Sequence, residues 1–167
     1  MLAFFVYVRL SYKTKYVDIV EVELNNIENK NQNLTKSFVL SVIKAESDFD
    51  INAKSSADAF GLMQITFLTA KDVAQKLDMN IEIDDLFVPQ KNIKIGVNYL
   101  SYLFDILDDK QLVLIAYNAG INRLKNWQKN DELKFENGFY VCPFLETTNY
   151  IKKVAFNERI YKKILKE

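Results

Sequence analysis

Histidine is absent from this sequence of 167 residues, and cysteine occurs once. Without histidine, the chain cannot build a Ser-His-Asp or Cys-His catalytic arrangement, a histidine metal site or a histidine pH switch. The single cysteine, Cys142, cannot form an internal disulfide or a CxxC pair. If the protein is an enzyme, its acid-base chemistry must come from carboxylates, lysine, tyrosine or that one thiol.

Net charge is also lacking, because 22 Lys and Arg residues balance 22 Asp and Glu residues. No global charge draws the chain towards nucleic acid, so we expect no nucleic-acid partner. Apolar residues make up 49% and charged residues 26%, which is typical of a soluble globular protein. The length suggests one domain with a real hydrophobic core.

Turn-forming residues are scarce, since four glycines and two prolines are too few for a sandwich or barrel with many tight turns. Apolar residues instead recur at helical steps of three and four. This pattern predicts helices over residues 16–28, 35–46, 62–77, 92–107, 121–127 and 150–161, and leaves 112–116 open between a strand and a buried helix. Thr35 and Asn92 are expected N-caps and Gly120 an expected C-cap. The sequence therefore predicts an all-α single domain over residues 16–167.

Residues 1–15 form a leading segment in which the apolar run 1–8 precedes Arg9, Lys13 and Lys15. This run is much shorter than the roughly 20 residues that span a bilayer, and it has no basic n-region or small-residue cleavage site. It fits the remnant of an N-terminal membrane anchor, a defective signal segment, or a first helical turn packed on the core. The sequence leaves all three open.

Glu46 follows Val39, Val42 and Ile43 at steps of seven, four and three, so it lies on the apolar face of its helix. A carboxyl at the buried end of an apolar stripe loses hydration, which raises its pKa and suits a general acid. A glutamate that reaches solvent from a helix end has the same spacing. The spacing alone does not choose between the two.

The alternation of Asp48, Asp50 and Asn52 is similar to the start of a calcium loop. The sixth position is Ala53, where such a loop needs Gly, and the twelfth is Ala59, where it needs a bidentate Glu. We therefore expect turn and capping hydrogen bonds here and no metal site.

Four blocks of residues follow one another between about Lys44 and Tyr161. The first is Glu46-Ser47-x-Phe49 with Asn52-Ala53-x-Ser55, Gly61-Leu62-Met63-Gln64-Ile65 and Thr69-Ala70, and the second is Asp85-Leu86, Pro89, Asn92-Ile93, Gly96 and Tyr99-Leu100. The third is Ala116-Tyr117-Asn118-Ala119-Gly120, and the fourth is Pro143-Phe144-x-Glu146-Thr147-x-x-Tyr150-Ile151-x-x-Val154. In this order the blocks resemble the soluble-lytic-transglycosylase (Slt-type) family, which cleaves peptidoglycan. The chain departs from the family pattern at Asp58 (usually Gly), at Thr66-Phe67 (where Pro is usual) and at Thr148 (usually Arg). We expect the loop at Asp58 to survive, because Asp still tolerates a left-handed backbone.

The resemblance implies a lysozyme-like α-helical fold and one essential glutamic acid, which falls on Glu46. It implies a lytic transglycosylase that needs no metal or cofactor, forms a 1,6-anhydro sugar and acts on peptidoglycan glycan strands outside the cytoplasm. We expect a monomer, and we leave membrane association through the N-terminus open. A hydrolytic muramidase on the same fold, and an inactive peptidoglycan-binding or envelope-assembly module, are the alternatives.

The resemblance also implies substrate-binding residues around the acid. Ser47 is placed to hydrogen-bond an N-acetyl group or Glu46, Gln64 to donate to a sugar carbonyl, and Tyr117 to orient an N-acetyl group. The full set of expected substrate-binding residues is Ser47, Met63, Gln64, Tyr117, Asn118, Glu146 and Tyr150. Two further residues are expected to pack in the core: Trp127, which is also able to stack on a sugar, and Cys142.

Overall fold

A computed structural model describes residues 12 and 14–167. Its helices are α2 (Val17–Asn25), α3 (Lys36–Ser47), α4 (Phe67–Lys76), the 3-10 helix η1 (Ile83–Phe87), α5 (Pro89–Ile106), α6 (Lys110–Ala119), α7 (Ile121–Lys129) and α8 (Leu145–Leu165). Two short antiparallel pairs accompany them: β1 (Ala59–Phe60) with β2 (Ile65–Thr66), and β3 (Lys134–Glu136) with β4 (Phe139–Val141). The expected mainly α-helical class is confirmed.

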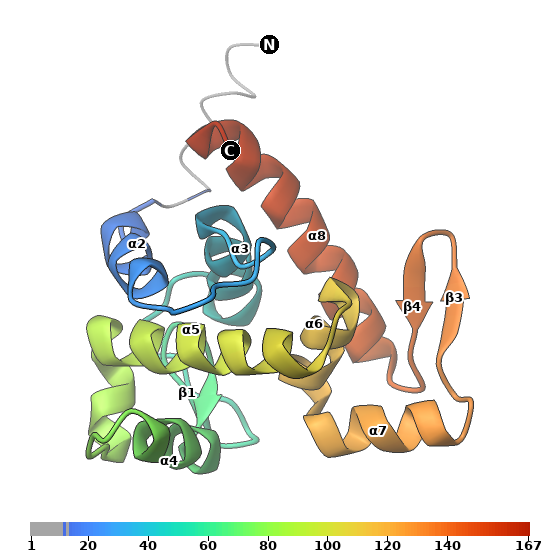
Figure 1. The fold of residues 1–167 in the computed structure, drawn as a ribbon, viewed down its shortest axis with the longest axis horizontal. Coiled ribbons are helices and arrows are strands. Elements are labelled where there is room, and N and C mark those ends of the chain that lie inside the picture. The colour runs from blue at the N-terminus through green and yellow to red at the C-terminus, as the bar shows by residue number, and fades with distance from the viewer. Residues whose placement is uncertain (1–11, 13) are drawn as a thin grey trace.

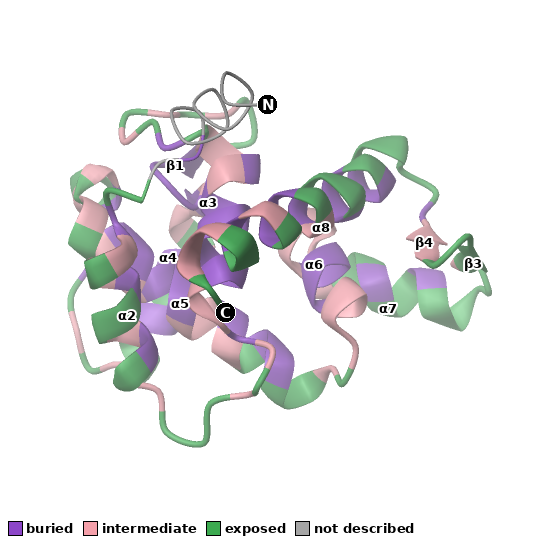
Figure 2. Ribbon diagram, turned by 90° about the horizontal axis from the view of Figure 1, so that it is seen from above, coloured by how far each residue is buried: buried purple, intermediate pink, exposed green. Residues whose placement is uncertain are grey.

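Helix α3 is the centre of the fold because it is apolar on nearly all sides, and a helix of that kind must be buried. Its longest packing partner is α8, which crosses the molecule diagonally, while α5 runs across beneath α2 and α3 (Figure 1). Figure 2 shows the buried residues on the sides of α3, α5, α6 and α8 that face one another. The end of α3 is thus enclosed by elements that are distant in the sequence.

Local signals explain several helix ends. The Thr35 side chain accepts a hydrogen bond from Phe38 N, which confirms Thr35 as the N-cap of α3. Gly120 ends α6 at a φ of 90° and also precedes α7, as expected for a C-cap glycine. Residues 112–116, which the sequence left open between a strand and a buried helix, lie within helix α6.

Three predicted helix starts are wrong. The 62–77 helix begins only at Phe67, because Gly61 and Gln64 have φ values of 70° and 47°, which no α-helix contains. The 92–107 helix begins at Pro89, and Asn92 is a buried interior residue and not its N-cap. The last helix starts at Leu145, five residues earlier than its apolar pattern indicates.

The β3–β4 hairpin was not predicted, although its turn carries a sequence signal. Asn137 and Gly138 both have positive φ, at 51° and 82°, which is the backbone of a type I′ hairpin turn. The two strands pair Phe135 with Tyr140, whose rings meet edge to face at 5.2 Å.

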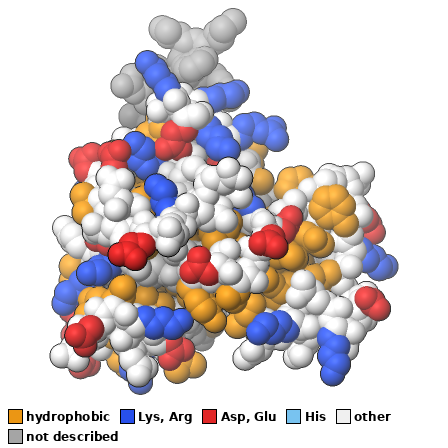
Figure 3. Space-filling model, in the orientation of Figure 1, with side chains coloured by type: hydrophobic (Ala, Val, Ile, Leu, Met, Phe, Trp, Pro, Cys, Tyr) orange, Lys and Arg blue, Asp and Glu red, His pale blue; other side chains and the backbone are white. Residues whose placement is uncertain are grey.

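Charged side chains of both signs are interspersed over the face seen in Figure 3, in keeping with the balanced composition. Among the described residues, no helix is both long enough and apolar enough to cross a bilayer. The three interpretations of the leading segment concern residues 1–15, of which 1–11 and 13 lie outside the described residues.

Candidate active site

Glu46 lies in the last turn of α3, where the buried helix reaches the surface. Burial is the largest cause, with a smaller contribution from the negative charge of Glu146, and the net effect of all neighbours is to raise the pKa of this carboxyl from 4.5 to about 7. The Tyr150 hydroxyl and the positive charge of Lys153 act in the opposite direction and lower this pKa. The apolar-face reading of Glu46 is therefore the correct one, and the carboxyl is neutral for about half of the time near pH 7.

Two tyrosines face this carboxyl, the half-buried Tyr117 from α6 and the buried Tyr150 from α8. Burial and the charge of Glu46 hold the pKa values of Tyr117 and Tyr150 well above 10, so both hydroxyls keep their protons. The buried Tyr150 hydroxyl faces the Glu46 carboxyl, and hydrogen bonding between the two groups lowers the pKa of Glu46 and raises that of Tyr150. Tyr150 is therefore a buried donor directed at the acid.

The turn Gly61–Gln64 passes beside Glu46 and is held by side chains from three helices. The Ser47 hydroxyl donates to Leu62 O at 2.8 Å, and the Tyr117 hydroxyl donates to Met63 O at 2.7 Å. Ser47 and Tyr117 therefore bond to the turn backbone, which fixes the position of this turn relative to the acid.

Asn92 completes this arrangement from the interior of α5. Its Oδ1 accepts from Met63 N at 2.8 Å, and its Nδ2 donates to Phe60 O at 2.9 Å and to Leu86 O at 2.8 Å. Three backbone groups on three segments thus share one fully buried amide. Gly61 permits this close approach, because a Cβ there would lie 2.1 Å from Leu86 O.

Gln64 adopts a left-handed backbone with a φ of 47°. Its Nε2 donates to Ala53 O at 3.1 Å and to Gly61 O at 3.0 Å, and because both partners are carbonyls, the amide orientation is unambiguous. Both amide hydrogens of Gln64 thus bond to the backbone, and Oε1 is left to accept a hydrogen bond. The donation from Gln64 to a sugar carbonyl stays a prediction, which requires one of these two bonds to break.

A groove of about 260 Å³ runs alongside the turn. It is lined by Gln64, Ile65, Thr66, Thr69, Tyr99, Tyr117, Asn118, Ala119 and Gly120. Asn118 is oriented by Thr147 of α8, whose hydroxyl donates to Asn118 Oδ1 at 2.8 Å. The structure therefore brings Gln64, Tyr117 and Asn118 together on one groove wall.

The other expected site residues divide into two groups. Glu146 is exposed in the first turn of α8, and Tyr150 is buried one turn later on the same helix, so both lie on the side of Glu46. Met63 does not line the groove: its side chain is fully buried against Gly96, where a Cβ would lie 2.3 Å from the sulfur. The prediction that the Met63 side chain lines the groove is therefore wrong. The Met63 backbone contributes to the site through its hydrogen bonds with Asn92 and Tyr117.

Two residues at the site were missed from the sequence, Asn92 as a buried hub and Lys153 as a charge beside the acid. A signal existed for Lys153, because Glu146, Tyr150 and Lys153 follow one another at i, i+4 and i+7 on one face of α8. No comparable local signal marks Asn92.

Trp127 and Cys142 are buried, as expected for core residues. Asp50 Oδ1 accepts from Asn52 N at 2.9 Å, and Asp48 pairs with Lys44 at 2.7 Å, which are the expected turn and capping interactions. In the part of the chain that the structure describes, no group of three His, Cys, Asp or Glu side chains could hold a metal ion.

The family departures are accommodated locally. Asp58 has a φ of 52°, so it takes the left-handed conformation that a glycine would occupy. Thr66 caps α4 by accepting from Thr69 N, which starts that helix without proline. Thr148 is buried, and its hydroxyl accepts from Cys142 N at 2.8 Å.

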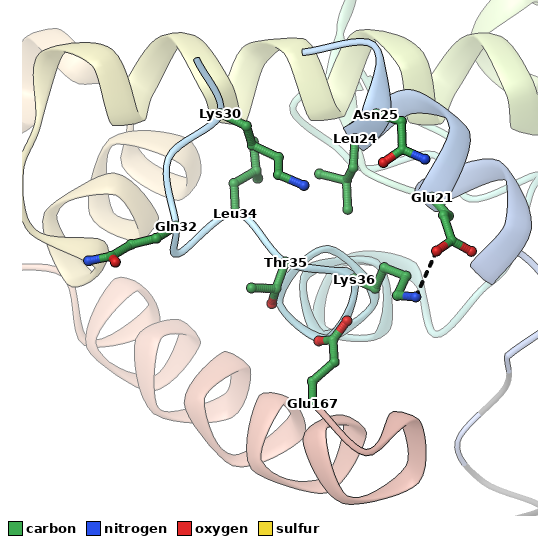
Figure 4. A pocket seen from close by; sticks show the side chains of 9 residues that line it. All are labelled: Glu21, Leu24, Asn25, Lys30, Gln32, Leu34, Thr35, Lys36 and Glu167. Atoms are coloured by element: carbon green, nitrogen blue, oxygen red, sulfur yellow. Dashed lines mark hydrogen bonds and ion pairs between the residues drawn. The ribbon is translucent and has the colours of Figure 1, made fainter. Parts of the chain in front are cut away.

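A second hollow lies at the opposite end of α3 (Figure 4). Glu21 and Lys36 form an ion pair of 2.9 Å on its rim, and Glu167 accepts from Ser37 N at 3.1 Å. Ten residues of helix, or about 15 Å, separate Lys36 from Glu46. This hollow is therefore distinct from the groove beside Glu46.

Comparison with known proteins agrees with this geometry. Residues 23–138 match the family described as the transglycosylase SLT domain. The chain is 33% identical over 143 residues to a Haemophilus influenzae protein named as a soluble lytic murein transglycosylase, covering 83% of this chain and 24% of that protein. It is 29% identical over 142 residues to the soluble lytic murein transglycosylase of Salmonella typhimurium, covering 80% of this chain and 21% of that one.

Solved structures share the fold. The lytic transglycosylase Slt of Pseudomonas aeruginosa, solved as an inactive Glu-to-Gln mutant, superposes with a TM-score of 0.78 at 28% identity, over 93% of this chain and 25% of its own. A 70-kDa soluble lytic transglycosylase in complex with bulgecin A has a TM-score of 0.83 at 24% identity, over 96% of this chain and 26% of its own. This chain thus spans about a quarter of the length of these proteins. Since the family match covers most of the chain, the protein belongs to the transglycosylase SLT domain family.

Proposed function

We propose that this chain carries the catalytic activity of a peptidoglycan lytic transglycosylase, with Glu46 as its single general acid and base. The observation that carries the proposal is the buried Glu46 carboxyl, whose pKa is about 7. A group that must first give and then take a proton works best when its pKa lies near the working pH. A carboxyl with the ordinary pKa of 4.5 would be ionised and could not begin the reaction.

The reaction follows from one carboxyl. Protonated Glu46 donates its proton to the glycosidic oxygen between N-acetylmuramic acid and N-acetylglucosamine. The bond from C1 to that oxygen breaks while the N-acetyl oxygen of the muramic acid bonds to C1. The Glu46 carboxylate then removes the proton from the 6-hydroxyl, whose oxygen displaces the N-acetyl oxygen at C1 and forms the 1,6-anhydro sugar. No water is consumed, and an internal nucleophile has a high effective concentration.

The surrounding residues would orient the substrate. Tyr150 directs its hydroxyl at the acid, and Tyr117 and Asn118 line the groove beside it. Gln64 would accept a hydrogen bond through Oε1, and Glu146 stands at the exposed edge as a second polar contact. Ser47 would hold the turn beside the acid, because its hydroxyl proton is donated to Leu62 O and not to the sugar.

The relatives support a substrate in the cell envelope. They are named soluble or membrane-bound lytic murein transglycosylases, and one related enzyme is inactive when a glutamate is replaced by glutamine. We propose that this protein acts outside the cytoplasm as a monomer on peptidoglycan glycan strands. Its attachment through the N-terminus belongs to the same proposal.

The decisive experiment digests purified peptidoglycan sacculi and identifies the products by mass spectrometry. The wild-type protein should release 1,6-anhydromuramic products, and Glu46→Gln should bind sacculi while its turnover falls by about 10²–10⁴-fold or more. Glu136→Gln, which changes an exposed carboxyl on β3 outside the site, is the matched variant and should keep most of the activity. Reducing-end products would show a muramidase, and the absence of any product from the wild type would leave a binding module.

A folded Glu46→Gln protein that retains more than about a tenth of the wild-type turnover would place the acid elsewhere, because loss of a general acid costs far more than tenfold. In that case Glu146, the next carboxyl towards the groove, becomes the candidate.

A further inference from the structure

Lys153 makes a direct contact between α8 and the end of α3. Its Nζ donates to Ala45 O at 2.6 Å, across 108 positions of sequence. Ala45 immediately precedes Glu46, so the ammonium group is attached to the peptide that carries the acid. No other residue of α8 is described with a side-chain hydrogen bond to the backbone of α3's last turn.

The acceptor of this bond lies in the last turn of a helix. Carbonyl oxygens there have no partner further along the helix, and together they place a partial negative charge at its C-terminal end. A partial negative charge beside Glu46 disfavours the carboxylate form. The Lys153 ammonium both satisfies the Ala45 carbonyl and opposes that field.

The groups that face Glu46 come from two other helices. Helix α8 contributes Glu146, Tyr150 and Lys153, and α6 contributes Tyr117. Glu146 disfavours the carboxylate, whereas Tyr150 and Lys153 favour it. The Tyr150 hydroxyl opposes burial most strongly, and Lys153, the one cation in this set, follows it.

We infer that Lys153 is a positioning residue for Glu46, which anchors the last turn of α3 to α8 and holds a positive charge beside the carboxylate that forms when Glu46 releases its proton. The inference rests on the proposed function, because it assigns Lys153 a part in the same proton transfer. A buried acid without a nearby cation has a higher pKa and is therefore a weaker proton donor. Lys153 should therefore affect kcat more than KM.

The test compares Lys153→Met with Lys153→Arg and with Lys152→Met. Lys152 and Lys153 are both exposed, but Lys152 lies over the Phe139 ring at 6.0 Å, so its variant controls for the loss of one positive charge from α8. The first readout is the titration of the Glu46 side-chain carboxyl by ¹³C NMR without substrate, assigned by its disappearance in Glu46→Gln. The second is the pH profile of kcat and of kcat/KM on sacculi.

In Lys153→Met, the midpoint of the Glu46 titration and the apparent pKa of the basic limb of the pH profile should both shift to higher pH by about 0.5–1 unit. On the plateau of the profile below the basic limb, where Glu46 is protonated in both proteins, we expect kcat to fall about two- to threefold with KM little changed, because a weaker acid donates its proton less readily. Lys153→Arg should restore both readouts, because guanidinium keeps the charge, and Lys152→Met should match the wild type. Melting curves of all three variants show whether each is folded.

An unshifted Glu46 titration in folded Lys153→Met overturns the inference, whatever the enzyme activity. An equal shift in Lys152→Met also overturns it, because the effect would then be a general charge effect. If the NMR shift appears while the wild type releases no anhydro product, the interaction between Lys153 and Glu46 stands and the proposed function fails.

Discussion

Replacing Glu46 by Gln should stabilise the folded protein at alkaline pH while it removes catalysis. The folded carboxyl keeps its proton up to about pH 7, whereas in the unfolded chain it ionises around its ordinary pKa of 4.5. A raised pKa contributes stability that is fully present below the unfolded pKa and is lost as pH rises through the folded pKa. Glutamine does not titrate, so it escapes this loss.

The magnitude follows from the two pKa values. Each unit of difference is worth 1.36 kcal/mol, so the advantage of Glu46→Gln should be close to zero at about pH 4, about 1.4 kcal/mol at about pH 5.5 and about 3 kcal/mol above about pH 8. For a domain of this size, about 3 kcal/mol corresponds to a rise of roughly 6–12 °C in Tm. The difference should level off once the folded carboxyl has ionised.

The assay is urea unfolding followed by far-UV circular dichroism at these three pH values, with melting curves in parallel. Glu136→Gln is the matched control, because Glu136 is an exposed carboxyl on β3 and its replacement relieves no burial. The control should show no growing advantage with pH. Equal stability of Glu46→Gln and wild type at about pH 8 would refute the buried, proton-retaining carboxyl and with it the basis of the proposed mechanism.

Four other predictions follow from the described contacts. Asn92→Ala should cost about 3–5 kcal/mol in urea unfolding because three buried backbone groups lose their partner, whereas Asn98→Ala, which removes a single bond to its own helix, should cost about 1 kcal/mol or less. Gly61→Ala should lower the free energy of unfolding by more than about 2 kcal/mol and lower Tm with it, since its φ is 70° and its Cβ would meet a carbonyl oxygen; a normal Tm would show that the turn relaxes freely. Glu158→Gln should cost about 1–2 kcal/mol, an effect that shrinks in high salt, because a mostly buried carboxylate loses its 2.8 Å ion pair with Lys110. Lytic activity should survive a metal chelator, and loss of activity that calcium restores would contradict this.

The sequence alone determined the features that depend on neighbours along the chain. Helical periodicity and the scarcity of turn residues predicted the all-α class, and Thr35 and Gly120 were identified as caps because capping is a local interaction. The placement of Glu46 on an apolar face also followed from spacing, since residues four and seven apart share one face of a helix. The β3–β4 hairpin had a local signal in Asn137-Gly138 that the helical pattern overshadowed.

Only the tertiary structure decided which polar groups are buried and what they bond. Asn92 resembles a helix cap in sequence, yet it joins segments that lie up to 32 positions away, and no local pattern records such bonds. Met63 stands within a block of expected groove residues but turns into the core, because Gly96 of α5 leaves room for its side chain. The pKa of Glu46 likewise depends on Tyr150 and Lys153, about 100 positions away, because desolvation and nearby charge act through space and not along the chain.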